Sequence, residues 1–265
     1  MKRASVRGIE MAYDDVGSGP PVVLLHGYPF NRSMWREQAE SLSASNRVIT
    51  PDLRGLGETS ASADATTMYE MAEDVAALLD KLEIRRVITG GLSMGGYVAL
   101  AFYRRFPLRV RALLLADTRP QADTEEARRS RAEQEKIILR DGMEAIADSF
   151  LTKVLAPATL SERAEVVARV RRMITTTDPQ GAVAALRAMA ARPDHTDFLP
   201  TIFPPTLIMV GSQDKLTPPA DAELMHREIR GARLHIIDGA AHLSNIERPA
   251  EFNRALADFL QTLQP

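Results

Sequence analysis

The sequence contains no cysteine among its 265 residues. This absence excludes disulfide bonds, metal sites held by thiolates and a cysteine nucleophile, and it fits a cytoplasmic location. No stretch approaches the roughly 20 apolar residues that a membrane-spanning helix needs. The basic residues Lys2, Arg3 and Arg7 precede no apolar run. We therefore expect neither a signal peptide nor a membrane partner.

An excess of charge of either sign is also missing. Lys and Arg total 33 and Asp and Glu total 35, which gives a formal net charge of −2. This balance provides no broad basic surface for a nucleic acid. The five histidines include no pair at metal-ligand spacing on one predicted element, and the 11 methionines are scattered like core and pocket residues. We expect no nucleic-acid partner, no metal and no cofactor.

Short apolar runs alternate with helical patterns along most of the chain, which predicts an α/β protein with a mainly parallel sheet. Residues 3–15 alternate between apolar and polar, which predicts an antiparallel hairpin at the sheet edge. Helices are predicted at 33–43, 67–82 and 96–106. The predicted buried strands are 22–25, 47–50, 86–90, 110–116, 206–210 and 233–237.

The segment between Ala116 and Pro204 interrupts this alternation, because it contains no convincing strand. Its sequence is rich in Ala, Arg, Glu and Leu, and it is too long and too periodic to be a loop. We predict a helical cap over residues 119–199. The cap would be inserted into a core domain made of residues 1–118 and 200–265.

The segment Gly91-Leu92-Ser93-Met94-Gly95 follows a predicted strand and precedes a predicted helix. In this context Gly-x-Ser-x-Gly is typical of a nucleophile elbow, a sharp turn that holds the serine in a strained conformation. Glycine is needed at 91 and 95 because larger side chains would collide there. The pattern predicts Ser93 as a nucleophile exposed at the top of the sheet, where its strand ends, beside a helix N-terminus that favours negative charge.

A serine hydroxyl needs a base to accept its proton. Among the histidines, His242 alone lies on a loop after a predicted strand, in Asp238-Gly239-Ala240-Ala241-His242, where sites of open α/β sheets are built. The other histidines are His26, His195, His226 and His235.

The base in turn needs a carboxylate to fix its tautomer. Asp214 directly follows the strand at 206–210, and the order Ser93, Asp214, His242 is that of this type of site. Asp117 also ends a strand and fits the same order, so it remains the main alternative. Asp52 and Asp238 are weaker candidates.

Two backbone N–H groups are needed to stabilise the oxyanion that forms when serine attacks a carbonyl. Met94 provides one directly after the nucleophile. Tyr28 is predicted to provide the second, because Gly27 lets the backbone approach and Pro29 has no N–H. His26 is expected to hold this loop by hydrogen bonds.

Taken together, these segments resemble the α/β hydrolase family over nearly the whole chain. The resemblance implies an eight-stranded sheet flanked by helices, with a catalytic triad at its edge and a cap above it. The chain departs from the family at Leu56, where histidine is frequent, and serine at 93 argues against the branches that use aspartate to cleave epoxides or carbon–halogen bonds. The matching segments are His26-Gly27 with Trp35, Asp52 to Ser60, Gly91 to Gly96, Gly211 to Asp214 and Gly239 to His242.

Within the serine branch, the chain is similar to small carboxylesterases and to 3-oxoadipate enol-lactonases. We expect a small uncharged ester as substrate, because Tyr28, Phe30 and Met94 predict an apolar pocket. An enol-lactone carries a carboxylate and would need a cation, for which Arg119, Arg187 and Arg192 are candidates. Cofactor-free perhydrolysis of the haloperoxidase type, carbon–carbon bond hydrolysis and a binding role without catalysis remain open.

Overall fold

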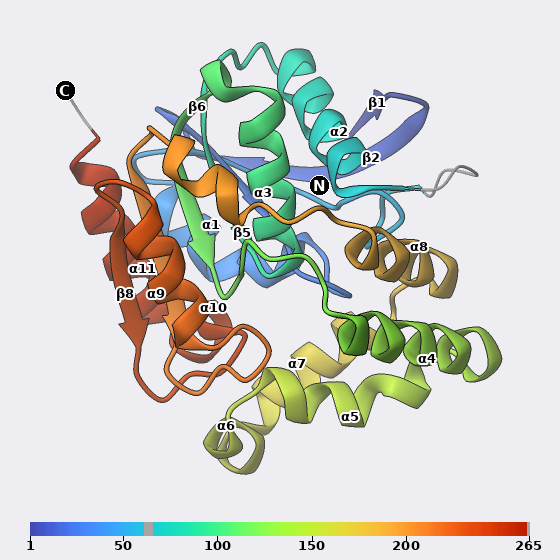
Figure 1. Cartoon of the computed structure of the whole chain (residues 1–265). Helices are drawn as coiled ribbons and strands as arrows, with labels where there is room; N and C mark the ends of the chain where they lie inside the picture. The colour runs from blue at the N-terminus through green and yellow to red at the C-terminus, as the bar shows by residue number, and fades with distance from the viewer. Residues whose placement is uncertain (61–65, 264–265) are drawn as a thin grey trace.

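The computed structural model describes residues 1–60 and 66–263. Within these ranges the chain forms one eight-stranded sheet in the order β1-β2-β4-β3-β5-β6-β7-β8 (Figure 1). β2 pairs antiparallel with β1 and β4, and the other neighbours are parallel. The expected edge hairpin and mostly parallel sheet are confirmed. The strands are β1 (Lys2–Val6), β2 (Ile9–Val16), β3 (Pro21–Leu25), β4 (Arg47–Pro51), β5 (Val87–Leu92), β6 (Val110–Ala116), β7 (Thr206–Gly211) and β8 (Arg233–Ile237).

The helices of the sheet domain cover both faces of the sheet. Crossovers between parallel strands are right-handed, so the face on which a crossover helix lies depends on the direction in which the chain moves across the sheet. The chain moves in one direction from β3 to β4 and in the opposite direction at the later crossovers. The helix between β3 and β4 therefore lies on the face opposite to the other crossover helices. Accordingly α1 packs against α11, and α2 packs against α3. These helices are α1 (Arg36–Leu42), α2 (Met68–Lys81), α3 (Met94–Arg105), α9 (Pro219–Glu228), α10 (Ser244–Glu247) and α11 (Pro249–Gln261), with the 3-10 turns η1 (Arg32–Trp35), η2 (Pro107–Arg109) and η3 (Thr196–Thr201).

Five further helices lie between β6 and β7, in the region where the sequence predicts a cap. Their ends follow from local sequence: Gly142 ends the first at a positive φ of 78°, and Pro157 and Pro179 each begin a helix. Figure 1 shows most of them gathered at one end of the sheet. We call this group the cap helices: α4 (Glu125–Asp141), α5 (Glu144–Val154), α6 (Pro157–Glu162), α7 (Ala164–Thr175) and α8 (Pro179–Ala190).

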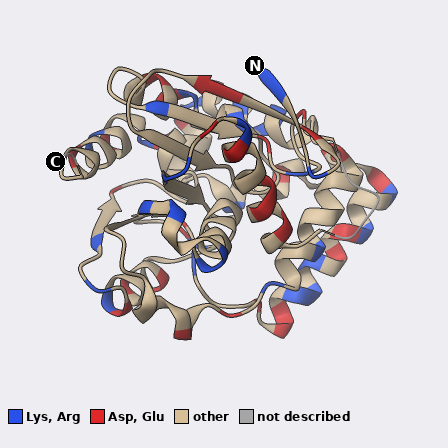
Figure 2. Cartoon of the chain, turned by 90° about the horizontal axis from the view of Figure 1, so that it is seen from above, with Lys and Arg blue, Asp and Glu red and all other residues tan. Residues whose placement is uncertain are grey.

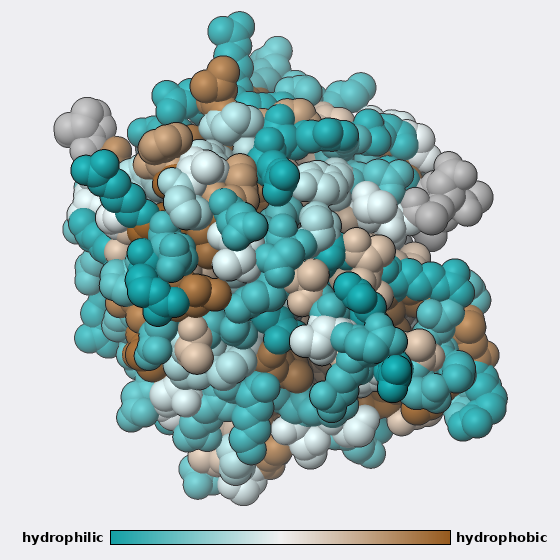
Figure 3. All heavy atoms as spheres, viewed as in Figure 1, coloured by the Kyte–Doolittle hydropathy of each residue, from teal (hydrophilic) through white to brown (hydrophobic). Residues whose placement is uncertain are grey.

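Acidic and basic residues are interspersed over the surface, and α4 carries both signs along its length (Figure 2). The face shown in Figure 3 is mainly hydrophilic, with apolar residues scattered over it. No helix among the described residues has the length and apolar character of a membrane span. Every residue of β5 and of β7 is buried, which explains why both read as apolar runs.

Two connections leave β3 and β5 in opposite directions across the sheet, since β3 leads to β4 and β5 leads to β6. A crevice forms at the carboxyl ends of two such strands, and ligands of open α/β sheets bind there. The loop that begins at His26 follows β3, and Ser93 follows β5. The topology therefore brings these two segments together.

Candidate active site

The turn between β5 and α3 places Ser93 in an unusual backbone conformation, with φ 55° and ψ −117°. A Cβ added to Gly91 would lie 2.0 Å from the carbonyl oxygen of Gly95, and one added to Gly95 would lie 2.0 Å from that of Leu25. Neither position can accept a side chain. The helix begins at Met94, two residues earlier than predicted, so Ser93 is its N-cap residue.

Ser93, His242 and Asp214 form a continuous hydrogen-bonded chain across three loops. The Nε2 atom of His242 lies 2.8 Å from the Oγ atom of Ser93. Its Nδ1 atom lies 2.8 Å from Oδ2 of Asp214. With the proton on Nδ1, the imidazole donates to Asp214 and accepts the hydroxyl proton of Ser93. The three residues predicted from the sequence therefore come together in the order that proton transfer requires.

The carboxylate of Asp214 is buried and receives further hydrogen bonds from its own loop. Its Oδ1 atom accepts from the backbone N–H groups of Leu216 (2.8 Å) and Thr217 (3.1 Å), and its Oδ2 atom accepts from the Thr217 hydroxyl (2.7 Å). Burial alone would raise the pKa of Asp214, but its interactions with His242 and Thr217 hold the pKa below its ordinary value. Asp214 is thus stabilised as an anion next to Nδ1 of His242.

Asp117, the main alternative acid, has other hydrogen-bond partners. It accepts from the backbone N–H of Gly211 at 2.9 Å and from the Ser244 hydroxyl. Burial, with the charges of Asp214 and Glu247, raises its pKa well above the ordinary value. Asp117 therefore ties together the loops that carry Asp214 and His242. The two weaker candidates are engaged as well, since Asp52 pairs with Arg32 and Asp238 accepts from the Ser212 hydroxyl.

The loop after β3 lies directly beside the nucleophile. A Cβ added to Gly27 would lie 3.4 Å from the Cβ atom of Ser93, which is van der Waals contact, so the backbone of this loop runs close against the nucleophile. Within the described ranges, the backbone N–H groups of Tyr28 and Met94 have no backbone or side-chain acceptor. Two free donors on the two segments that meet at Ser93 are what an oxyanion hole needs.

His26 braces this loop, as the sequence suggests. Its Nε2 atom accepts from the backbone N–H of Leu53 at 2.9 Å, and its Nδ1 atom lies 2.9 Å from the Gly27 carbonyl oxygen. Complete burial lowers the pKa of His26, which keeps the ring neutral and suited to donate on one side and accept on the other. His26 is a structural part of the site.

A cavity of about 170 Å³ opens at Ser93 and His242, between the sheet edge and the cap helices. Tyr28 lies on its wall, as predicted, but Phe30 and Met94 do not. Both of these side chains are fully buried, and Phe150 of α5 covers Phe30, with ring centroids 6.1 Å apart. The prediction that Phe30 and Met94 line the substrate pocket is therefore wrong for this cavity. The lining residues are Tyr28, Ser93, Tyr97, Arg119, Ala127, Ser130, Arg131, Gln134, Phe150, Lys153, Met189, Leu216, Thr217 and His242.

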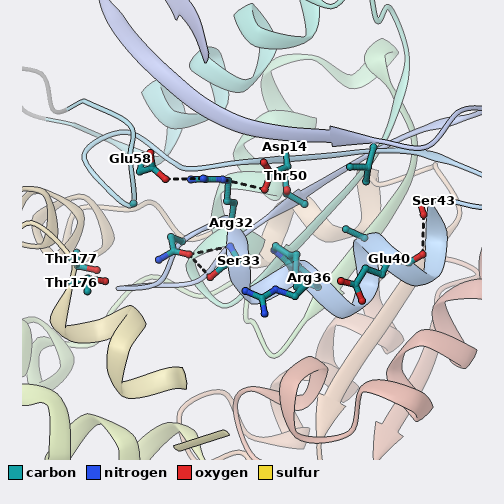
Figure 4. A pocket seen from close by; sticks show the side chains of 15 residues that line it. Asp14, Arg32, Ser33, Arg36, Glu40, Ser43, Thr50, Glu58, Thr176 and Thr177 are labelled. Atoms are coloured by element: carbon teal, nitrogen blue, oxygen red, sulfur yellow. Dashed lines mark hydrogen bonds and ion pairs between the residues drawn. The ribbon is translucent and has the colours of Figure 1, made fainter. Parts of the chain in front are cut away.

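A larger cavity of about 670 Å³ lies elsewhere, beside η1 and α1 (Figure 4). Its wall includes neither Ser93 nor His242. Arg32, one of the charged residues that line it, points towards Glu58 and Asp14 and forms ion pairs with both (Figure 4). The residues that line this cavity include no histidine, whereas the smaller cavity holds both Ser93 and His242, so the smaller one is the candidate active site.

Comparison with known proteins identifies the family. A model of the alpha/beta hydrolase fold matches residues 20–249. The chain belongs to this family. It is 30% identical over 247 residues to 3-oxoadipate enol-lactonase 1 of Acinetobacter baylyi, which covers 93% of this chain and 91% of that protein.

Solved structures agree with this assignment to the α/β hydrolases. A malate-bound thermophilic esterase from Thermogutta terrifontis matches with a TM-score of 0.97 and 38% identity over 100% of both chains. The enol-lactonase from Burkholderia xenovorans LB400 matches with a TM-score of 0.92 and 31% identity, over 98% of this chain and 100% of that one. Leu56, where the family often has histidine, is fully buried in this hydrolase.

The three arginines considered from the sequence have different surroundings. Arg119 lines the cavity at Ser93. Arg187 is exposed on α8 and pairs with Glu135. Arg192 is buried, pairs with Asp123 and lies over the Tyr97 ring at 4.1 Å. Of these three, only Arg119 is placed to meet a substrate.

Two residues of this hydrolase site were not predicted from the sequence. Thr217 supports Asp214, and the spacing Asp-x-x-Thr just before a helix could have revealed it. Glu247 accepts from the backbone N–H of Ala241 at 2.7 Å and from that of Ala156 at 2.8 Å, so it joins the His242 loop to the cap. No sequence signal indicated that role. Across the described residues, no group of His, Asp and Glu side chains forms a possible metal site.

Proposed function

We propose that this α/β hydrolase cleaves small carboxylic esters through an acyl-enzyme on Ser93, with His242 as general base and acid and Asp214 orienting it. The observation that carries the proposal is the hydrogen-bonded chain from Ser93 Oγ through His242 to Asp214, with 2.8 Å at each link. Serine attack needs this proton path, because the hydroxyl alone is a weak nucleophile.

The proposed reaction has two stages, acylation of Ser93 and hydrolysis of the acyl-enzyme. His242 accepts the hydroxyl proton as Oγ of Ser93 attacks the ester carbonyl carbon, and the free N–H groups of Tyr28 and Met94 stabilise the oxyanion. The intermediate collapses when the protonated His242 donates to the leaving alcohol. Water then enters and attacks the acyl carbon while His242 removes one of its protons. The bond from that carbon to Oγ of Ser93 breaks, His242 returns the proton to Oγ, and the acyl group leaves as a carboxylic acid. The cavity of about 170 Å³ favours short acyl groups.

Reaction with a fluorophosphonate probe tests the nucleophile, with Ser130 on the same cavity wall as a matched control. Mass spectrometry should place the adduct on Ser93, and the labelling should persist in Ser130→Ala. The Ser93→Ala variant should stay folded and lose about three orders of magnitude or more in p-nitrophenyl acetate hydrolysis. An adduct on Ser130, Ser212 or Ser244 would overturn the assignment.

A lactone is the second candidate substrate, because enol-lactonases are among the relatives at 30% and 31% identity. A lactone is an ester closed into a ring, so the same residues would open it, and the leaving alcohol would stay attached to the acyl group. The two functions are separated by kcat/KM for p-nitrophenyl acetate through octanoate against 3-oxoadipate enol-lactone. A lactone advantage of about hundredfold or more would make lactone hydrolysis the function.

A further inference from the structure

The charge on the wall of the Ser93 cavity is of one sign. Among the described residues that line it, Arg119, Arg131 and Lys153 carry positive charge, and no lining residue is Asp or Glu. The chain as a whole is nearly neutral, with a formal charge of −2. A small cavity lined by cations and no acids attracts an anion rather than an uncharged ligand.

Two of these three cations need no ligand. Arg131 forms an ion pair with Asp123, so its charge is already compensated within the protein. Lys153 is exposed on α5, where water can satisfy its ammonium group. Arg119 is the cation that requires a separate explanation.

Arg119 forms no hydrogen bond or ion pair with any described residue, and its Nε atom is buried without a partner. Buried N–H groups are seldom left unpaired in folded proteins. Arg169 and Arg192 also have a buried Nε without a partner, but their terminal nitrogens bind Glu37 and Asp123, respectively. Arg119 differs because its whole guanidinium group lacks an acceptor within the described chain.

The backbone next to Arg119 is fixed to the nucleophile elbow. The hydroxyl of Thr118 donates to the carbonyl oxygen of Ser93 at 2.8 Å. Arg119 therefore begins from the sheet edge beside Ser93 and not from a cap helix. Burial raises the pKa of the nearby Asp221, and the charge of Arg119 only partly offsets that rise. Asp221 accepts a hydrogen bond from Gln121 at 3.0 Å and forms no ion pair with Arg119.

We propose that Arg119 binds a carboxylate of the substrate, so that the natural substrate is a small ester or lactone carrying a free carboxylate group. A planar guanidinium group can donate two parallel hydrogen bonds to a carboxylate, which gives orientation as well as affinity. The proposal rests on the function proposed for Ser93, and it replaces the uncharged substrate expected from the sequence.

Two pairs of esters test the proposal, and in each pair a compound with a free carboxylate is compared with its methyl ester, which carries no charge. The first pair is p-nitrophenyl hydrogen glutarate and p-nitrophenyl methyl glutarate, with the carboxylate in the acyl part. The second pair is m-carboxyphenyl butyrate and its methyl ester, with the carboxylate in the alcohol part. Ser93→Ala provides the blank for spontaneous hydrolysis.

For at least one pair, the wild-type protein should show a kcat/KM ratio of anionic to neutral ester of about ten or more. Arg119→Gln should lower that ratio about tenfold, mainly through KM, and Arg119→Lys should restore part of it. Arg187→Gln, which removes an exposed arginine of the cap, should leave the ratio unchanged. A ratio near one for both pairs in the wild type would overturn the proposal. A ratio that persists in Arg119→Gln and disappears in Lys153→Gln would also overturn it.

A binding measurement separates failure of this proposal from failure of the proposed function. Glutarate should bind Ser93→Ala in isothermal titration calorimetry, and binding should weaken about tenfold or more in the Ser93→Ala, Arg119→Gln double variant. If glutarate binds in this way while the wild type hydrolyses no ester, the proposed function fails and the anion site stands. Equal binding, or no binding, in both variants would overturn the anion site.

Discussion

Replacing Asp214 with asparagine should reduce kcat by about four orders of magnitude with little change in KM, because the variant cannot hold His242 in its working tautomer. The oxygen of the new side-chain amide can stay opposite the N–H groups of Leu216 and Thr217, which now lie 2.8 and 3.1 Å from Oδ1 of the aspartate. The NH₂ group then faces Nδ1 of His242. It donates to that nitrogen and forces the ring proton onto Nε2, where it blocks proton transfer from Ser93.

The opposite orientation of the amide is unfavourable. With the oxygen facing His242, the NH₂ group would face the two backbone N–H groups, and three donors would meet without an acceptor. We therefore expect the first orientation, in which the ring proton of His242 lies on Nε2. A loss of about four orders of magnitude in rate corresponds to about 5.4 kcal/mol of transition-state stabilisation.

Asp117→Asn is the matched control, since it makes the same chemical change in the neighbouring buried acid. The pKa of Asp117 is raised, mainly by burial, so a neutral side chain at this position resembles the protonated acid. An asparagine oxygen can still accept from Gly211, and its NH₂ group can donate to the Ser244 hydroxyl. We expect a loss in kcat of less than about tenfold.

Steady-state kinetics on p-nitrophenyl acetate, with thermal unfolding as a check on folding, measures both variants. If Asp117→Asn loses three orders of magnitude or more and Asp214→Asn stays within about tenfold of wild type, the orienting acid is Asp117 and the reasoning is wrong.

Two further measurements follow from other features. Gly95→Ala should destabilise the protein by at least about 2 kcal/mol in urea unfolding, because its methyl group would lie 2.0 Å from the Leu25 carbonyl oxygen; an unchanged midpoint would refute that contact. Burial, helped by the charge of Arg104, lowers the pKa of His195 from 6.5 to about 4. Its stabilising contribution is therefore complete above about pH 6.5 and is lost towards pH 4, so wild type should lose at most about 3 kcal/mol relative to His195→Gln over that range, less any solvent screening. A difference in urea midpoints that stays constant with pH would show that His195 is not perturbed in this way.

The elbow could be predicted from the sequence because its constraints are local. Gly91 and Gly95 are required by contacts of 2.0 Å with the backbone, and such contacts permit only one residue type. The buried strands were readable for a similar reason, since strands covered on both faces become continuous apolar runs. Its place on a loop after a strand indicated His242, whereas chain order left both Asp214 and Asp117 as candidates for the acid.

The residues that line the cavity could not be predicted from the sequence, because they depend on which face of each cap helix points towards the sheet domain. Phe150 stands in front of Phe30, so a residue of α5 takes the place expected for one from the sheet domain. The sequence also could not show which of three arginines lines the cavity. Arg119, Arg187 and Arg192 look alike in the sequence, and they are distinguished only by partners such as Glu135 and Asp123 that lie far along the chain or on another helix.

The positions of Ser93, Asp214 and His242 at the ends of β5, β7 and β8 also bear on how activity arises during folding. Ser93 and His242 are 149 residues apart in the chain, and their contact requires the parallel pairing of β5 through β8 to be complete. Such long-range parallel pairing is entropically costly and forms slowly. A refolding chain can therefore recover helical content before it recovers any turnover. Under the proposed function, ester hydrolysis would return only after β5 through β8 have paired, so its recovery should lag behind the recovery of helical circular dichroism.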